Sequence, residues 1–227
     1  MNSRQTNTIA TQAPHGSENL PHLQGMGRRE RRAAETRLRL FRCALQLFAA
    51  RGLANVTVED ITEAADVGKG TFFNYFKSKD HVLGVMAEIQ LGKVREALEL
   101  AEHHGQTTHA VLHHLFHRAA EEPGRSPDLA RALISSFLAS QAVRKVIKGN
   151  MQEGRRMIAE VVAAGQKDGE IDPRLKKEKV ATQVLQTFMG TVLLWSLHEK
   201  PALDVWMEDS FQHFWRGIAV SGQEQKL

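Results

Sequence analysis

The residues best suited to contact a polyanion lie within one short segment, KGTFFNYFK, and are Lys69, Gly70, Thr71, Phe73, Asn74 and Lys77. Phe72 and Phe76 are spaced i and i+4, so on a helix they share one apolar face and turn the other residues outward or sideways. The outward surface offers hydrogen-bond donors, an aromatic ring, a gap at Gly70 and a basic rim, with no acidic side chain. These groups suit a DNA major groove lined by phosphates.

The preceding residues predict the elements that position this surface. A first short helix is expected from about Val58 to Ala65, with Thr57 as its N-cap and Asp60 in the capping-box position. Its apolar face would comprise Val58, Ile61, Ala64 and Ala65. After a turn at residues 66–68, the second helix would run from Lys69 to Phe76. Two short helices joined by a turn containing Gly are typical of a helix-turn-helix, and the alternative is an ordinary helical hairpin at the surface.

The segment from Ala64 to Asp80, AADVGKGTFFNYFKSKD, resembles the DNA-binding motif of the tetracycline-repressor (TetR) family of bacterial transcriptional regulators. It departs from the usual pattern at Phe73, where Tyr is common, and at Asp66, where Gly is usual. The lost hydroxyl at position 73 removes one expected phosphate contact. The resemblance implies two sets of DNA-binding residues: base-edge or groove contacts from Lys69, Gly70, Thr71, Phe73 and Asn74, and phosphate contacts from Thr57, Tyr75, Lys77 and Lys79.

Charge is concentrated in the same part of the chain. The 227 residues carry a net charge of +4. Residues 28–80 hold 11 Lys/Arg against 7 Asp/Glu, which accounts for all of it, while residues 1–27 and 81–227 are each neutral. A basic module on a neutral body indicates a polyanionic partner at one end of the molecule. The lone Cys43 fits a reducing cytoplasm, and neither a secretory signal nor an apolar run long enough for a membrane span is expected.

The helical periodicity predicts an all-α protein of about nine helices in three parts. Residues 1–27 are expected to be a disordered tail and residues 28–80 a three-helix DNA-binding domain. For residues 81–227, the TetR resemblance implies an effector-binding and dimerisation domain. Beyond the helix-turn-helix, the predicted helices span 28–51, 78–105, 107–122, 128–140, 141–167, 176–200 and 202–220. The boundary at Ser140 has no strong helix breaker.

The last two predicted helices carry more apolar residues than one bundle can bury. A second apolar face needs a partner, and the TetR resemblance implies that this partner is a second copy, joined through a four-helix bundle. The resemblance also implies an effector pocket among the fourth to eighth helices. Plausible apolar wall residues are Phe116, Phe137, Met151, Met157 and Phe188, although core packing is the better explanation of any one of them. No effector-binding residue is assigned.

Six histidines lie within fifteen positions: His103, His104, His109, His113, His114 and His117. His109, His113 and His117 fall on one helical face, and two His at i and i+4 can share a metal ion. No Cys, Asp or Glu lies close by on that face to complete a site. We therefore expect no metal and no cofactor, and interpret the histidines as a polar pocket wall or a solvated face.

Enzymatic chemistry is not indicated. The sequence contains no G-x-S-x-G, H-E-x-x-H or C-x-x-C motif, and Gly68–Thr71 lacks the spacing of a phosphate-binding loop. The resulting hypothesis is a ligand-responsive regulator, in the repressor mode, that binds a palindromic double-stranded DNA operator as a homodimer and is released by a small molecule. The alternatives are a helical small-molecule-binding or metal-sensing protein without operator specificity and, within the same class, an activator.

Overall fold

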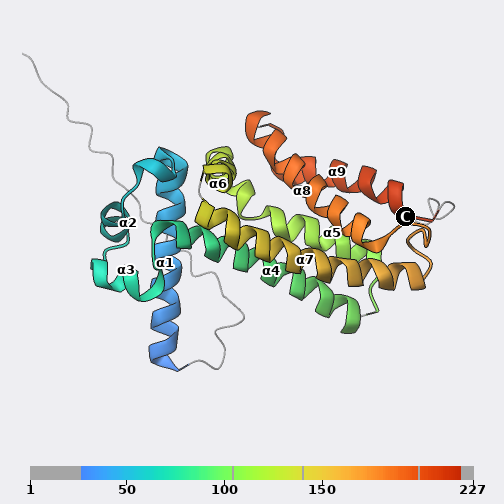
Figure 1. The fold of residues 1–227 in the computed structure, drawn as a ribbon, viewed down its shortest axis with the longest axis horizontal. Helices are drawn as coiled ribbons and strands as arrows, with labels where there is room; N and C mark the ends of the chain where they lie inside the picture. Colours follow the sequence, from blue (N-terminus) through green and yellow to red (C-terminus); the bar gives the residue numbers. More distant parts are fainter. Residues whose placement is uncertain (1–26, 104, 140, 199, 221–227) are drawn as a thin grey trace, which may run out of the picture. The chain divides into compact units, whose positions relative to one another are not determined.

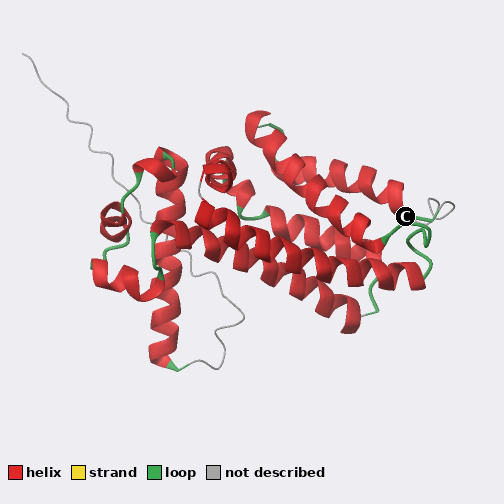
Figure 2. Cartoon of the chain, viewed as in Figure 1, coloured by secondary structure: helices red, strands yellow, loops and turns green. Residues whose placement is uncertain are grey.

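The computed structural model describes residues 27–103, 105–139, 141–198 and 200–220. Over these residues the chain forms nine α-helices and two short 3-10 helices, and no named strand (Figure 1, Figure 2). The predicted all-α class is therefore confirmed. The elements are α1 (Arg28–Arg51), η2 (Leu53–Asn55), α2 (Val58–Ala64), α3 (Lys69–Tyr75), α4 (Lys79–His103), α5 (Thr108–Ala120), η3 (Pro123–Arg125), α6 (Pro127–Ala139), α7 (Gln141–Lys167), α8 (Lys177–His198) and α9 (Leu203–Ile218).

Contacts divide the chain into two units, Met1–Thr36 and Arg37–Leu227. In the first unit the described part is the start of α1, where Gly27 donates its N–H to Glu30 at 3.0 Å. The predicted tail at residues 1–26 and the uncertain boundary at Ser140 lie outside the described residues. All further structure discussed below belongs to the second unit.

The helix ends match the expected ones to within two residues because strong stop signals mark them. Gly52, Gly105 and Gly169 adopt φ values of 76°, 56° and 77°, a left-handed conformation that glycine reaches without steric cost. The periodicity did not predict η2, η3 or an isolated antiparallel bridge between Ile171 and Ala219. These pieces are too short to show a repeating pattern in the sequence.

One hydrophobic cluster holds the helix-turn-helix together and extends beyond it. It joins the inner faces of α1, α2 and α3 to the first half of α4, and it also includes Leu129 and Leu133 of α6 and Val143 of α7. The predicted domain boundary at residue 80 therefore lies within a continuous apolar cluster and stays a prediction.

A second cluster fills the space between the longer helices. It is built from α5, α7, α8 and α9 with part of α4 and α6, and its fully buried members include Phe116, Ile158, Met207 and Phe211. Helix α4 lies along α7 and α5, as Figure 1 shows, so one helix borders both clusters. Helix α8 is long and apolar enough to span a membrane by length and composition alone, but Val180, Val184 and Trp195 on it are buried in this cluster.

Candidate nucleic-acid interface and ligand cavity

Helix α2 begins with the capping box that the sequence predicts. Thr57 Oγ1 accepts from the Asp60 N–H at 3.1 Å, and Asp60 Oδ2 accepts from the Thr57 N–H at 2.7 Å. These bonds satisfy backbone donors that a helix N-terminus leaves unpaired. The inner face of α2 differs from the predicted one in one place: Ala64 is exposed, and Thr62 is buried with its hydroxyl donating to Glu59 O at 3.0 Å.

The turn between α2 and α3 contains Asp66 in a left-handed conformation, with φ at 50°. Asp tolerates this region better than most residues, although Gly adopts it with least strain. After the turn, Phe72 and Phe76 point into the first cluster and are both fully buried, with ring centroids 5.4 Å apart. The inward face predicted for α3 is therefore confirmed, and it fixes which residues α3 presents to solvent.

The outer face of α3 presents most of the predicted groove-contacting residues together. Lys69, Gly70, Asn74 and Phe73 are exposed, the last with 55% of its surface accessible, and Thr71 is half-buried. A Cβ built on Gly70 meets no atom within 4 Å. The fold itself therefore leaves room for a larger side chain at Gly70.

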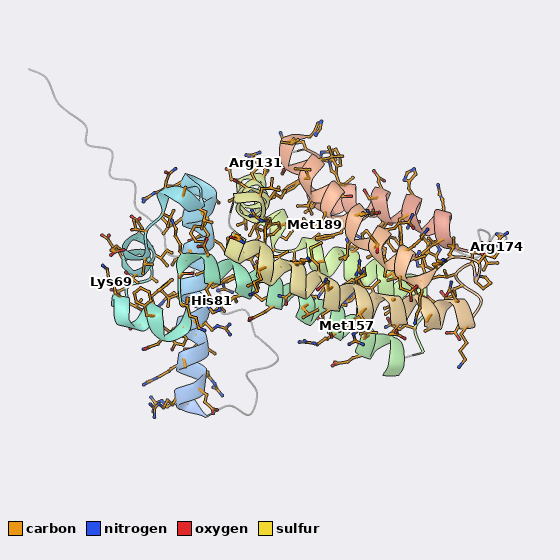
Figure 3. All side chains as sticks on the ribbon, viewed as in Figure 1. Lys69, His81, Arg131, Met157, Arg174 and Met189 are labelled. Carbon is orange, nitrogen blue, oxygen red and sulfur yellow. The ribbon has the colours of Figure 1, made fainter. Side chains whose placement is uncertain are left out.

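Lys69 stands at the start of α3 and forms an ion pair with Glu59 of α2 (Figure 3). Both side chains are more than half exposed. The hydrogen bond from Lys69 is the main cause that lowers the pKa of Glu59. An exposed pair of this kind contributes little to stability, so Lys69 can exchange Glu59 for another anion.

Three of the predicted phosphate-contacting residues have partners or packing within the protein. The Lys79 ammonium donates to the carbonyls of Leu53, Ala54 and Val56 at 2.7, 3.3 and 2.8 Å, which uses its three N–H groups. The Thr57 hydroxyl donates to Asp60 Oδ2 at 2.6 Å. Tyr75 is half-buried against the first cluster, and Lys77 is exposed. The predicted DNA contacts of all four stay predictions, and this geometry disfavours those of Lys79 and Thr57.

An apolar cavity of about 150 Å³ lies between α4, α5, α6, α7 and α8. Four of the five wall residues expected from the sequence line it: Phe116, Phe137, Met151 and Phe188. The fifth, Met157, is buried on α7 and does not line the cavity, so it is a core residue. Figure 3 labels Met157 on α7 and Met189, another lining residue, on α8.

Two polar side chains, Gln90 of α4 and Asn150 of α7, interrupt the apolar lining. Gln90 donates to the Ala119 carbonyl at the end of α5 at 3.1 Å, while its Oε1 is buried without a partner. Asn150 Nδ2 is also buried without a partner. Buried polar atoms in proteins are usually satisfied, so an unpaired acceptor and an unpaired donor beside one cavity indicate a ligand or water with complementary groups. No local sequence pattern distinguishes these two residues from ordinary helical ones.

An open groove of about 580 Å³ adjoins the cavity and shares five lining residues with it: Phe137, Ile147, Met151, Leu185 and Met189. Its other residues include Arg144, Lys148 and Arg155 of α7, with no acidic residue among the lining groups. Three cations on one side of a groove favour an anionic group there. Sequence reasoning missed this arrangement because the three residues look like the solvated face of a long helix.

Comparison with known proteins now identifies the family. Residues 40–86 match the family model described as bacterial regulatory proteins, tetR family, and residues 129–211 match that of the tetracyclin repressor-like C-terminal domain. Together these matches cover more than half of the chain. The chain belongs to the TetR family. The first match, from Leu40 to Met86, comprises the second half of α1, the whole of α2 and α3, and the start of α4.

A curated relative matches part of this TetR-family chain. The HTH-type transcriptional regulator TcmR of Streptomyces glaucescens is 40% identical over 82 residues, which is 36% of this chain and 33% of TcmR. The matched region thus spans about one third of the length of that relative.

Two solved structures extend the similarity over most of the chain. FadR of Bacillus subtilis in complex with stearoyl-CoA aligns with a TM-score of 0.68 at 20% identity, over 80% of this chain and 98% of that one. The Thermus thermophilus repressor FadR in complex with lauroyl-CoA aligns with a TM-score of 0.58 at 27% identity, over 81% and 95%. The first likeness shows the shared TetR fold, and both neighbours are transcriptional regulators.

Proposed function

We propose that this chain acts in the bacterial cytoplasm as a homodimeric TetR-family repressor, which binds a palindromic operator and is released by a small molecule held in the cavity. The proposal contains no catalytic step and needs no cofactor. Each subunit would place α3 in a major groove, and a two-fold axis would relate the two half-sites.

The observation that carries the proposal is the position of α4. Near its start, Val82, Leu83 and Met86 pack in the same cluster as Phe72 and Phe76 of α3. Further along, Met86, Gln90, Leu91 and Val94 line the cavity. A ligand that binds more tightly to one position of α4 therefore also shifts the residues of α4 against which α3 packs. This is the physical requirement for coupling between two sites, namely a shared element that both of them bias.

For the DNA contacts, we propose that Lys69, Gly70, Thr71, Phe73 and Asn74 face the bases and that Tyr75 and Lys77 hold phosphates. Gly70 supports this assignment because nothing inside the protein requires the absence of a side chain there. DNA lying close to α3 would instead occupy the space that a side chain at position 70 needs. Phe73 can meet a thymine methyl group, and Asn74 can donate to and accept from a base edge.

We assign Thr57 and Lys79 a supporting role. Lys79 joins the start of α4 to three carbonyls before α2, and Thr57 fixes the first turn of α2. Both residues hold the α2–α3 pair in place rather than contacting the operator directly.

Dimerisation is proposed through α8 and α9. Leu193, Leu194 and Leu197 of α8 and Val205 of α9 are between 42% and 64% exposed although they are large and apolar. Clusters of this kind on one surface are typical of subunit interfaces. From membership of the TetR family, we propose that the partner is a second copy of the same chain.

The effector is proposed to combine a long apolar body with an anionic end. The cavity and the adjoining groove would together take the apolar part, Gln90 and Asn150 a polar group beside the cavity, and Arg144, Lys148 and Arg155 the anion. Long-chain acyl-CoA molecules have this chemistry, and two structural neighbours hold such ligands.

A gel-shift titration with the DNA flanking its own gene tests operator binding. Gly70→Ala should weaken specific binding at least about tenfold, because a methyl group obstructs close approach, while helix propensity keeps the protein folded. Lys69→Ala should weaken it and reduce the salt dependence of the affinity. Gly149→Ala, an exposed helical glycine on α7 with equally free surroundings, is the matched control. Binding that is indifferent to duplex sequence, or equally affected by both glycine variants, would contradict the proposal.

The effector class is tested on the protein–operator complex with stearoyl-CoA, coenzyme A alone and stearate as separate probes. Stearoyl-CoA should dissociate the complex at the lowest concentration, since it alone supplies both parts. Lys148→Ala should raise the concentration required, whereas Lys145→Ala, a lysine of the same helix outside the groove, should not. A complex that stearoyl-CoA leaves intact would reject this ligand class without rejecting operator binding.

A further inference from the structure

Helix α5 carries His109, His113 and His117 on one face, and α9 packs against that face. The contacts include His109 and His113 against the ring of Phe211, with centroids 5.2 and 5.1 Å apart. The α9 helix also brings a carboxylate to the histidines. Sequence reasoning found no acidic residue near this face because Glu208 lies far along the chain, so its expectation of an incomplete ligand set is corrected here.

Glu208 and two of the histidines converge on a common point. The Nε2 atoms of His113 and His117 lie 2.7 and 3.0 Å from the same carboxylate oxygen, Glu208 Oε2. All three of these atoms lie within 4.8 Å of one another. Around a tetrahedral zinc ion, with ligand bonds of about 2.0–2.1 Å, neighbouring donor atoms stand about 3.3 Å apart. A small withdrawal of the Glu208 side chain therefore makes room for an ion.

The surroundings hold the three groups in place without sealing them off. Gln212 Nε2 donates to the other carboxylate oxygen, Glu208 Oε1, at 2.8 Å, which orients the carboxylate from outside the triad. The side chains of His113, His117 and Glu208 are between 32% and 43% exposed, so an ion can reach them from solvent.

We propose that His113, His117 and Glu208 form a binding site for a divalent transition-metal ion of the zinc class. Two imidazole nitrogens and one carboxylate are a donor set that zinc accepts, with water in the remaining position. Gln212 acts as the outer partner that orients Glu208. The bound ion would tie α5, which lines the cavity with Leu115 and Phe116, to α9. This inference does not depend on operator binding.

Isothermal titration of the metal-stripped full-length protein with Zn²⁺ tests the site. One ion should bind per chain, and the melting temperature should rise with added Zn²⁺. Glu208→Gln keeps the size and hydrogen-bonding capacity of the side chain, and His117→Gln removes one nitrogen ligand. Each should weaken Zn²⁺ binding at least about tenfold, since even the loss of an outer-sphere partner commonly costs that much. Co²⁺ should give visible absorption bands typical of a four-coordinate ion in the wild-type protein, and these bands should be lost in Glu208→Gln and His117→Gln.

The matched control is His213→Gln. His213 lies on α9 near Glu208, is exposed, and makes its Nδ1 contact with Asp209 O at 2.7 Å, away from the triad. It should leave Zn²⁺ affinity and the Co²⁺ spectrum unchanged. Thermal melting without metal checks that each variant is folded. The proposal is overturned if the wild-type protein binds no stoichiometric ion, or if folded Glu208→Gln and His117→Gln proteins bind Zn²⁺ as tightly as His213→Gln.

Discussion

The α2–α3 segment and the helices around the cavity gather their functional residues over very different distances along the chain. The exposed face of α3 is set by caps, a turn and two inward phenylalanines, all between Thr57 and Phe76. The cavity draws its lining from five helices, between Met86 and Met189. The exposed face of α3 is therefore determined by residues close together in the sequence, whereas the cavity forms only when distant helices pack.

Two glycines illustrate this difference between the α2–α3 segment and the helices around the cavity. A Cβ added to Gly70 of α3 would have no neighbour within 4 Å, so any constraint on this position comes from outside the chain. At Gly165 on α7, a Cβ would lie 2.7 Å from Thr108 Oγ1 and 3.0 Å from Thr108 Cβ. Internal packing explains the absence of a side chain at Gly165, whereas at Gly70 the proposed explanation is the approach of DNA. Substitutions can separate these two reasons.

The largest effect is expected at the proposed dimer interface. Leu197→Arg places a charge on the exposed apolar surface of α8, and a two-fold axis places it there twice. Dimer dissociation should become more favourable by roughly 4 kcal/mol or more, about a thousandfold in the dissociation constant. Analytical ultracentrifugation measures this change. The control is Leu138→Arg, which changes a similarly exposed leucine of α6. If Leu138→Arg disrupts the dimer and Leu197→Arg does not, the interface does not include the exposed leucines of α8.

Gly165→Ala should lower the free energy of unfolding by about 1–3 kcal/mol, because the added methyl group overlaps a buried, branched Thr108 side chain. Urea denaturation measures the loss. The double variant with Thr108→Ala should recover part of it, since the overlapping Oγ1 and Cγ2 atoms are gone. If the two substitutions lower stability additively, the close approach of α5 and α7 is not the cause.

The same contrast explains what sequence reasoning could reach. The helix-turn-helix, the capping box and the inward phenylalanines follow from spacing alone, and the positions of α7 and α8 follow from breakers such as Gly169. The site formed by His113, His117 and Glu208 could not be predicted, because its carboxylate comes from another helix. Lys79 shows the converse limit, since sequence spacing did not reveal that this basic residue of the motif donates to backbone carbonyls.

Asp66→Gly should raise the free energy of unfolding by about 0.5–1 kcal/mol, because glycine reaches the left-handed conformation at φ 50° with less strain than Asp. Urea denaturation again provides the measurement. Asp168→Gly is the control, since Asp168 is exposed and has a negative φ, and there the extra freedom of glycine in the unfolded chain should reduce stability. Equal changes in both variants would show that the turn is not strained.

The smallest effect is expected at the ion pair that joins α2 and α3. Glu59→Gln removes the carboxylate that competes with DNA for Lys69, and it also removes a negative charge beside the α3 surface. Operator affinity should therefore increase, by up to about fivefold, since exposed ion pairs contribute little. The gain should shrink at high salt, because screening already weakens the pair. Fluorescence anisotropy at two salt concentrations measures both quantities. The control is to make the same substitution in a Lys69→Ala background, where no lysine is freed. Glu59→Gln should then increase operator affinity much less. An equal increase without Lys69 would show that the lost negative charge of Glu59, and not the release of Lys69, causes the effect.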